Sequence, residues 1–149
     1  MNKQIIITSS PEETRQYAKN LVGNLSLPVI ITLTGDLGSG KTTFVQGLAE
    51  GLGIEKKVNS PTFLIIKKYE GDRTLYHADL YRLSSEKEVA GTGLLEILNE
   101  KNSIVVIEWA EKMGKYLPEK RIDIQFKYVD ENKREIIIMN FQDSISNFQ

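Results

Sequence analysis

The chain has 149 residues, of which 40% are hydrophobic and 26% are charged, and its formal net charge is −1. These values predict one globular domain over residues 1–149 with a sizeable core, and they argue against an autonomous nucleic-acid binder, which usually has a strongly basic face. The lack of cysteine excludes disulfides, thiolate catalysis and zinc–thiolate sites, and because neither a signal-peptide core nor an apolar run near the roughly 18 residues of a membrane span is present, we expect a cytoplasmic protein.

The first part of the chain is expected to alternate strands and helices. Residues 3–8 are predicted to form a strand, and residues 10–13 (SPEE) are typical of a helix start, with a serine cap, a proline in the first turn and a glutamate for a capping box. The segment 29–34 is nearly all apolar, as expected for a strand buried on both faces. A helix over 41–52 is expected to follow the glycine-rich residues.

The second part of the chain carries two hairpin signals and one buried strand. A helical stretch is expected over 84–99, with an interruption near the glycines of Gly91-Thr-Gly93. An apolar run at 104–107 predicts a buried strand that ends at Glu108. The remaining predicted strands, which pair around polar turns, are 63–70 with 74–82 and 121–129 with 134–141.

Residues 35–42 (GDLGSGKT) match the phosphate-binding pattern G-x-x-x-x-G-K-[ST] in full. The glycines let backbone N–H groups curl around phosphate oxygens, and the next helix points its positive N-terminal end at the same anion. Lys41 is expected to neutralise the β- and γ-phosphates, and Thr42 to offer its hydroxyl to Mg²⁺. With its strand–loop–helix context, the motif predicts a P-loop NTPase-like three-layer α/β sandwich, with a mostly parallel central sheet and antiparallel hairpin additions.

A magnesium ion in such a site needs a second protein anchor, and a hydrophobic strand that ends in an acid supplies it. The run IVVIE at 104–108 makes Glu108 the candidate, with glutamate in place of the commoner aspartate. The longer side chain would place the ion farther from the strand or reach it through water. Asp79, at the end of the alternating run 75–78, is the rival acid, and a solvated acid at a strand end is the alternative interpretation of Glu108.

Features of other nucleotide-dependent proteins are missing. No N-K-x-D guanine reader is found late in the chain, so adenine is favoured, without a positive signal of its own. The few arginines do not cluster as the lid of a small-molecule kinase would. Spacings typical of metal enzymes are absent as well, and His77 is the one histidine.

Four runs follow one another along the chain: GDLGSGKTTF, NSPTF, YHADLYRL and IEWAEK. In order, spacing and overall length they resemble the TsaE family (formerly YjeE or YdiB), small bacterial P-loop ATPases required to form N6-threonylcarbamoyladenosine (t6A37) in tRNAs that read ANN codons. The resemblance covers essentially the whole chain and is weakest at the N-terminal strand, around 84–99 and in the tail. It implies a protein that binds the TsaB–TsaD pair, meets tRNA through that complex, and hydrolyses ATP with Mg²⁺ to reset it, weakly when alone.

The resemblance also implies roles for individual residues. Lys41, Thr42, Asp79 and Glu108 are implied to be catalytic, with Thr42 and Glu108 as magnesium ligands. Asp79 would position water or contact the ion through a water molecule. The implied switch-like loop consists of Ser60, Pro61, Thr62 and Phe63. The residues implied to bind ATP are Ser10, Asp36, Leu37, Gly38, Ser39, Gly40, Lys41, Thr42, Thr43, Trp109 and Arg134.

Two other functions stay open on the sequence. A small-molecule or nucleoside kinase would transfer the phosphoryl group to a metabolite, and that metabolite would accelerate ADP release. A nucleotide-gated binding module would need no meaningful turnover, and its ATP-dependent association with a partner would survive the loss of hydrolysis. The second of these overlaps with the accessory ATPase that the resemblance implies.

Overall fold

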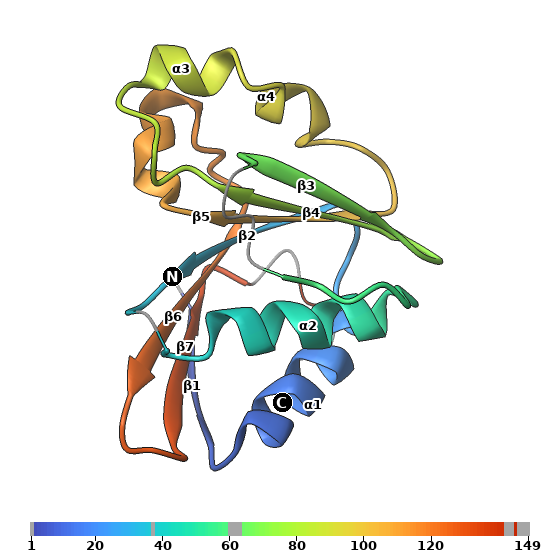
Figure 1. Ribbon diagram of the computed structural model, residues 1–149, viewed down its shortest axis with the longest axis vertical. Helices are drawn as coiled ribbons and strands as arrows, with labels where there is room; N and C mark the ends of the chain where they lie inside the picture. The colour runs from blue at the N-terminus through green and yellow to red at the C-terminus, as the bar shows by residue number, and fades with distance from the viewer. Residues whose placement is uncertain (1, 37, 60–63, 142–144, 146–149) are drawn as a thin grey trace.

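The computed structural model describes residues 2–36, 38–59, 64–141 and 145, which form a three-layer α/β arrangement (Figure 1). The strands are β1 (Lys3–Thr8), β2 (Val29–Thr34), β3 (Ile66–Glu70), β4 (Thr74–Asp79), β5 (Ser103–Glu108), β6 (Ile122–Tyr128) and β7 (Arg134–Met139). The helices are α1 (Pro11–Val22), α2 (Lys41–Gly51), α3 (Glu86–Ala90), α4 (Leu94–Ile97) and the 3-10 helix η1 (Ala110–Tyr116). None of the helices in these described ranges is long and apolar enough to cross a membrane.

The sheet has seven strands in the order β1-β7-β6-β2-β5-β4-β3. Its centre is parallel, because β6, β2, β5 and β4 run in one direction. Strands β7, β1 and β3 pair antiparallel at the two ends, so the predicted parallel centre with antiparallel hairpin additions is confirmed. Since parallel strands end at the same edge of a sheet, the loops after β2, β4 and β5 meet at that edge.

The predicted strand boundaries differ most on β3 and β4. The strand predicted over 74–82 ends at Asp79, because the Asp79 carboxylate accepts a hydrogen bond from the backbone N–H of Tyr81 at 3.0 Å and turns the chain. The strand predicted over 63–70 begins at Ile66, and the residues before Leu64 in that run lie outside the described ranges. The predicted interrupted helical stretch is confirmed as α3 and α4.

Helix α1 begins with the predicted cap. The Ser10 hydroxyl accepts a hydrogen bond from the Glu13 backbone N–H at 3.0 Å. The Glu13 carboxylate in turn accepts one from the Ser9 backbone N–H at 2.9 Å, so the capping box closes on Ser9 rather than on Ser10. Pro11 occupies the first turn, where its missing N–H leaves no hydrogen bond unmade. These bonds fix the turn that leads from β1 into α1.

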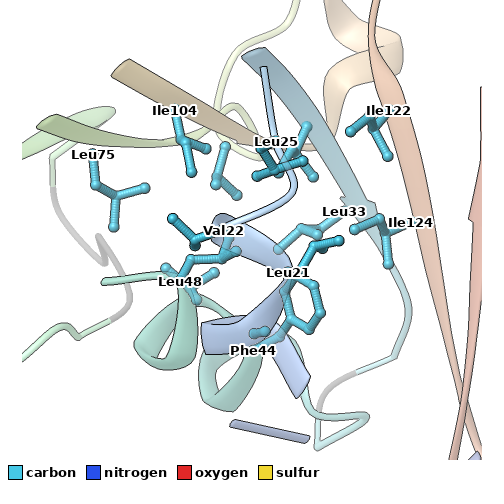
Figure 2. Packing of buried hydrophobic residues seen from close by; sticks show 14 of the residues in the cluster. Leu21, Val22, Leu25, Leu33, Phe44, Leu48, Leu75, Ile104, Ile122 and Ile124 are labelled. Carbon is cyan, nitrogen blue, oxygen red and sulfur yellow. The ribbon is translucent and has the colours of Figure 1, made fainter. Parts of the chain in front are cut away.

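The sheet separates two hydrophobic clusters. Ile104 and Val106 of β5 pack in the cluster of α1 and α2, which Figure 2 shows from close by. Val105 and Ile107 pack in the opposite cluster, with α3, α4 and η1. Because neighbouring residues of a strand point to opposite faces, a strand covered on both sides must be apolar throughout. This explains why the runs of β2 and β5 lack the polar alternation of a half-exposed strand.

Glycines set the separation of α1 and α2. A Cβ on Gly47 would lie 2.2 Å from the Arg15 carbonyl oxygen and 2.7 Å from the Ala18 Cβ. A Cβ on Gly51 would lie 2.8 Å from the Val22 Cβ. Side chains at these two positions would therefore push the helices apart, and with them the start of α2, where the glycine-rich loop ends.

We expect Gly47→Ala to lower the free energy of unfolding by about 1–3 kcal/mol, because α1 must shift to admit the methyl group. Chemical unfolding by urea, followed by circular dichroism, measures the change. Gly23→Ala is the matched control, since Gly23 has a helical φ of −63° and its Cβ would meet nothing closer than 3.6 Å. A Gly47→Ala variant as stable as the wild type would contradict the close packing of the two helices.

Candidate functional site

The glycine-rich loop joins β2 to α2, and two of its glycines are required by the backbone itself. A Cβ on Gly35 would lie 2.7 Å from the Ser39 hydroxyl and 2.9 Å from the Phe126 carbonyl oxygen. Gly40 has a φ of 107°, in the left-handed region that favours glycine, and immediately precedes α2. Helix α2 has no side-chain N-cap, so the N–H groups of its first turn are left for a ligand.

A cavity of about 740 Å³ opens over this loop. Its volume is in the range of sites that hold a small molecule or cofactor. It collects residues from the start of α1, the glycine-rich loop, the start of α2, the ends of β4 and β5, and the turn between β6 and β7. The lining residues are Pro11, Thr14, Gly35, Asp36, Gly38, Gly40, Lys41, Thr42, Thr43, Asp79, Tyr81, Glu108, Trp109, Glu131, Asn132 and Arg134.

Lys41 is held against the loop that precedes it. Its ammonium group donates a hydrogen bond to the Gly35 carbonyl oxygen at 2.7 Å and lies 3.4 Å from Glu108 Oε1. The hydroxyl of Ser39, a residue of this loop, is buried, does not line the cavity and has no hydrogen-bond partner among the described residues. The loop therefore presents a positive charge and open backbone donors to the cavity, which is the chemistry that binds an anion.

Glu108 ends β5, as the sequence predicts, but its carboxylate is buried and doubly engaged. Oε2 lies 2.7 Å from His77 Nε2, and Oε1 faces Lys41. Burial alone raises the pKa of Glu108, and the hydrogen bond from His77 with the charge of Lys41 outweighs it, so that the pKa lies below its ordinary value. The interpretation of Glu108 as a freely solvated acid is therefore wrong.

Asp79 ends β4 beside Glu108, because the two residues are paired in the parallel register of β4 and β5. Its carboxylate lines the cavity and accepts the hydrogen bond from Tyr81 that ends the strand. Its backbone N–H bonds to the Ile65 carbonyl oxygen at 2.9 Å, which ties the end of β4 to the segment just before β3. Both acids proposed from the sequence thus stand at one edge of the sheet.

Trp109 and Tyr81 form an exposed aromatic pair at the cavity. Their ring centroids are 5.1 Å apart, and Trp109 has a left-handed backbone with a φ of 61°. The Lys112 ammonium lies over both rings, at 5.5 Å from Tyr81 and 5.7 Å from Trp109. It also donates hydrogen bonds to the carbonyl oxygens of Tyr81 and Leu83. Lys112 thus contacts both rings and is anchored to the backbone beside them.

Arg134, the first residue of β7, reaches the glycine-rich loop from the far hairpin. One guanidinium nitrogen donates to the Gly38 carbonyl oxygen at 3.1 Å, and the group lies 4.6 Å from the centre of the Tyr128 ring. The adjoining turn brings Glu131 and Asn132 to the cavity. Neither residue belongs to a sequence motif, because only the pairing of β6 with β7 and β2 brings their turn to the loop.

Most of the remaining residues predicted from the sequence line the cavity, but Ser10 does not. Ser10 does not line the cavity, and its hydroxyl caps α1, whereas Pro11 and Thr14 of the same helix do line it. The Thr14 hydroxyl is hydrogen-bonded to that of Thr8 at 2.6 Å. Asp36, Gly38, Gly40, Lys41, Thr42 and Thr43 line the cavity. Leu37 and the switch-like residues Ser60, Pro61, Thr62 and Phe63 lie outside the described residues.

A second cavity of about 580 Å³ adjoins the first. The two share Gly35, Asp36, Lys41, Glu108 and Trp109. The second then continues along the end of β6. Lys41 and Glu108 therefore line both cavities.

We expect Lys112→Met to loosen the Tyr81–Trp109 pair, because the variant keeps the aliphatic stem but loses the charge and the hydrogen bonds to two carbonyl oxygens. Trp109 is the one tryptophan of the chain, so its fluorescence reports on the pair directly. Acrylamide quenching should increase, and the free energy of unfolding should fall by about 1 kcal/mol. Lys115→Met is the control, since the Lys115 ammonium lies over Tyr116 instead. Unchanged quenching in Lys112→Met would contradict the role of Lys112 in ordering the two rings.

A family model, individual relatives and a solved structure all place this chain beside the same family. The family model of the threonylcarbamoyl adenosine biosynthesis protein TsaE matches residues 8–136. The tRNA threonylcarbamoyladenosine biosynthesis protein TsaE of Bacillus subtilis is 44% identical over 130 residues, covering 87% of this chain and 80% of that protein. The protein of the same name from Nostoc sp. is 41% identical over 148 residues, covering 95% and 88%.

A solved structure agrees with the sequence relatives. The crystal structure of Bacillus subtilis YdiB superposes with a TM-score of 0.76 at 36% sequence identity, covering 98% of this chain and 87% of that one. The family match spans the glycine-rich loop, both acids and Arg134. On these similarities, together with the phosphate loop and the acid that ends β5, the chain belongs to the TsaE family.

Proposed function

We propose that this chain is the ATP-hydrolysing accessory protein of t6A37 formation, acting in the cytoplasm on tRNAs that read ANN codons. In this proposal it binds the TsaB–TsaD pair, meets tRNA through that complex, and resets the complex by hydrolysing ATP. One observation carries the ATPase assignment: Lys41 of the phosphate loop lies 3.4 Å from Glu108, the acid that ends the adjacent parallel strand. Loop lysine and strand-end acid are the paired elements of P-loop nucleotide hydrolysis.

The residues present suit the triphosphate of ATP. The left-handed glycines bend the loop, and the uncapped start of α2 offers backbone N–H groups to an anion. The Ser39 hydroxyl is buried and does not line the cavity, so the proposed donors are the backbone N–H groups and Lys41. The lining residues Trp109 and Tyr81, together with Pro11, Thr14 and Asn132, offer apolar and polar surfaces to a nucleoside.

The donor set also suits Mg²⁺. Thr42 and Glu108 line the same cavity and supply a hydroxyl and a carboxylate, the oxygen ligands that magnesium prefers. Within the described ranges no three His, Asp or Glu side chains gather into a protein-only metal site. That arrangement fits an ion that takes most of its ligands from phosphates and water. When bound, the ion would neutralise charge on the β- and γ-phosphates.

The reaction we propose is in-line attack of water on the γ-phosphorus. A new bond forms between the water oxygen and phosphorus, the bond from phosphorus to the β-γ bridging oxygen breaks, and ADP and inorganic phosphate leave. The loop N–H groups and Lys41 hold the charge on the transferring group. Asp79, at the cavity edge with its carboxylate fixed by the Tyr81 N–H, orients the water.

This site is expected to turn over slowly when alone. Arg134 is the one arginine that lines the cavity in the described part of the chain, and its guanidinium is bonded to the Gly38, Asp130 and Lys133 carbonyl oxygens. An arginine supplied by a partner can increase such rates by about 10³–10⁵-fold. The proposal therefore includes stimulation by the TsaB–TsaD pair.

A second function, phosphoryl transfer to a small molecule, draws support from the adjoining cavity of about 580 Å³, which also reaches Lys41 and Glu108. Steady-state ATP hydrolysis separates the two. If TsaB and TsaD raise a low basal rate and t6A forms with all components present, the accessory ATPase is supported. If they change nothing and no t6A forms, that function is refuted, and a metabolite screen with labelled ATP then tests the kinase.

Thr42→Ala is expected to reduce ATP hydrolysis at least about tenfold, because the hydroxyl offered to magnesium is lost. Nucleotide binding should persist, since the loop N–H groups and Lys41 remain. Thr42→Ser, which keeps the hydroxyl, is the control and should retain most of the activity. Undiminished hydrolysis by Thr42→Ala would remove Thr42 from the magnesium site.

Asp79→Asn is expected to bind ATP with little change yet to support no t6A formation with TsaB, TsaD and tRNA. The amide keeps the shape of the side chain but loses the charge that orients water. Asp72→Asn, an exposed carboxylate in the turn at the opposite end of β4, is the control. Full t6A formation by Asp79→Asn would refute the role assigned to Asp79.

A further inference from the structure

The one histidine of the chain is buried in the sheet and points at the acid of the candidate site. His77 lies in β4, with no solvent exposure, and pairs in register with Val106 of β5. Two residues farther along β5, Glu108 lies on the same face of the sheet as His77. The ring therefore meets the carboxylate in the buried interior of the protein.

The two oxygens of Glu108 have different partners. Oε2 lies 2.7 Å from His77 Nε2, within hydrogen-bond distance, and both groups are buried. Oε1 lies 3.4 Å from Lys41 Nζ, beside the phosphate loop. With one oxygen held in the interior, the rotation of the carboxylate is restricted and the other oxygen is directed toward Lys41.

The hydrogen-bond pattern assigns the proton on the ring. An ionised carboxylate only accepts hydrogen bonds, so the hydrogen of this contact belongs to Nε2. His77 Nδ1 is buried and has no hydrogen-bond partner among the described residues. Among the described residues, the one hydrogen bond of the ring is therefore the one to Glu108.

We propose that His77 is a positioning residue: by holding Glu108 Oε2 it turns Oε1 toward Lys41 and the phosphate loop, so that Glu108 meets the magnesium–nucleotide complex in one fixed orientation. This inference rests on the proposed function, because it concerns the magnesium site of that ATPase. His77 acts through Glu108 and touches neither the nucleotide nor the ion. Its effect is on the energetic coupling between Mg²⁺ and nucleotide.

The test measures ADP affinity through Trp109 fluorescence, once in EDTA and once in Mg²⁺. Trp109 is the one tryptophan, follows Glu108 in sequence and lines the cavity. His77→Leu removes the donor, whereas His77→Gln keeps a side-chain N–H of similar reach. We expect all three proteins to bind ADP alike in EDTA. In Mg²⁺ the wild type and His77→Gln should bind ADP more tightly than in EDTA. This increase in affinity should be at least about tenfold smaller for His77→Leu.

A double-mutant cycle separates positioning from a merely structural role. With Glu108→Gln as the background, His77→Leu should cause no further loss of Mg²⁺-dependent affinity, because the group through which His77 acts is already changed. Circular dichroism checks that each variant is folded. If His77→Leu does not fold, His77→Met replaces it, since the flexible thioether fills the space without donating a strong hydrogen bond.

The outcomes distinguish the inference from the function on which it rests. If the wild type gains ADP affinity from Mg²⁺ and the folded Leu or Met variant gains as much, the positioning role of His77 is overturned while the proposed function stands. An additional loss in the Glu108→Gln background overturns it as well. If the wild type itself shows no binding of Mg²⁺-ADP, the proposed function fails and the inference fails with it.

Discussion

The site depends on the parallel pairing of β2 with β5, two strands buried on both faces. Their register sets Leu33 opposite Glu108, so the strand that leads into the phosphate loop and the strand that ends in the acid stop at the same level. Apolar clusters on both sides of the sheet hold this pairing in place. A slip by one residue would exchange side chains between the two apolar clusters and disrupt the packing of both. Phosphate loop and acid are therefore fixed relative to each other before any ligand binds.

The charge of Glu108 depends on that geometry. A buried carboxylate is costly unless charge and hydrogen bonds compensate for its lost hydration. Glu108 has both kinds of partner, Lys41 on the cavity side and His77 within the sheet. The pKa of the carboxyl group lies below its ordinary value for that reason, and a negative charge is maintained at the floor of the cavity. That negative charge suits the cation that, in the function we propose, binds together with the nucleotide.

The remainder of the site is open, and its rim is built from distant parts of the chain. Trp109 and Tyr81 are exposed and lie close to the Lys112 ammonium, and the Arg134 guanidinium, at the start of β7, donates a hydrogen bond to the loop at Gly38. An open cavity with a fixed floor suits a protein whose hydrolysis is completed by a partner. This agrees with the accessory role that we propose for this member of the TsaE family.

Local sequence determined the phosphate loop, the cap of α1, the apolar runs of β2 and β5, and Glu108 as a strand-end acid, because each depends on neighbours within a few residues. The contact of His77 with Glu108, the tilted ring contact of Tyr81 with Trp109 and the contact of Arg134 with Gly38 were decided by tertiary structure alone. The partners in these contacts lie tens of residues apart along the chain, and strand order and register bring them together. A one-dimensional pattern of polar and apolar residues predicts that a strand exists but does not specify which strand lies beside it, and these contacts depend on that neighbour.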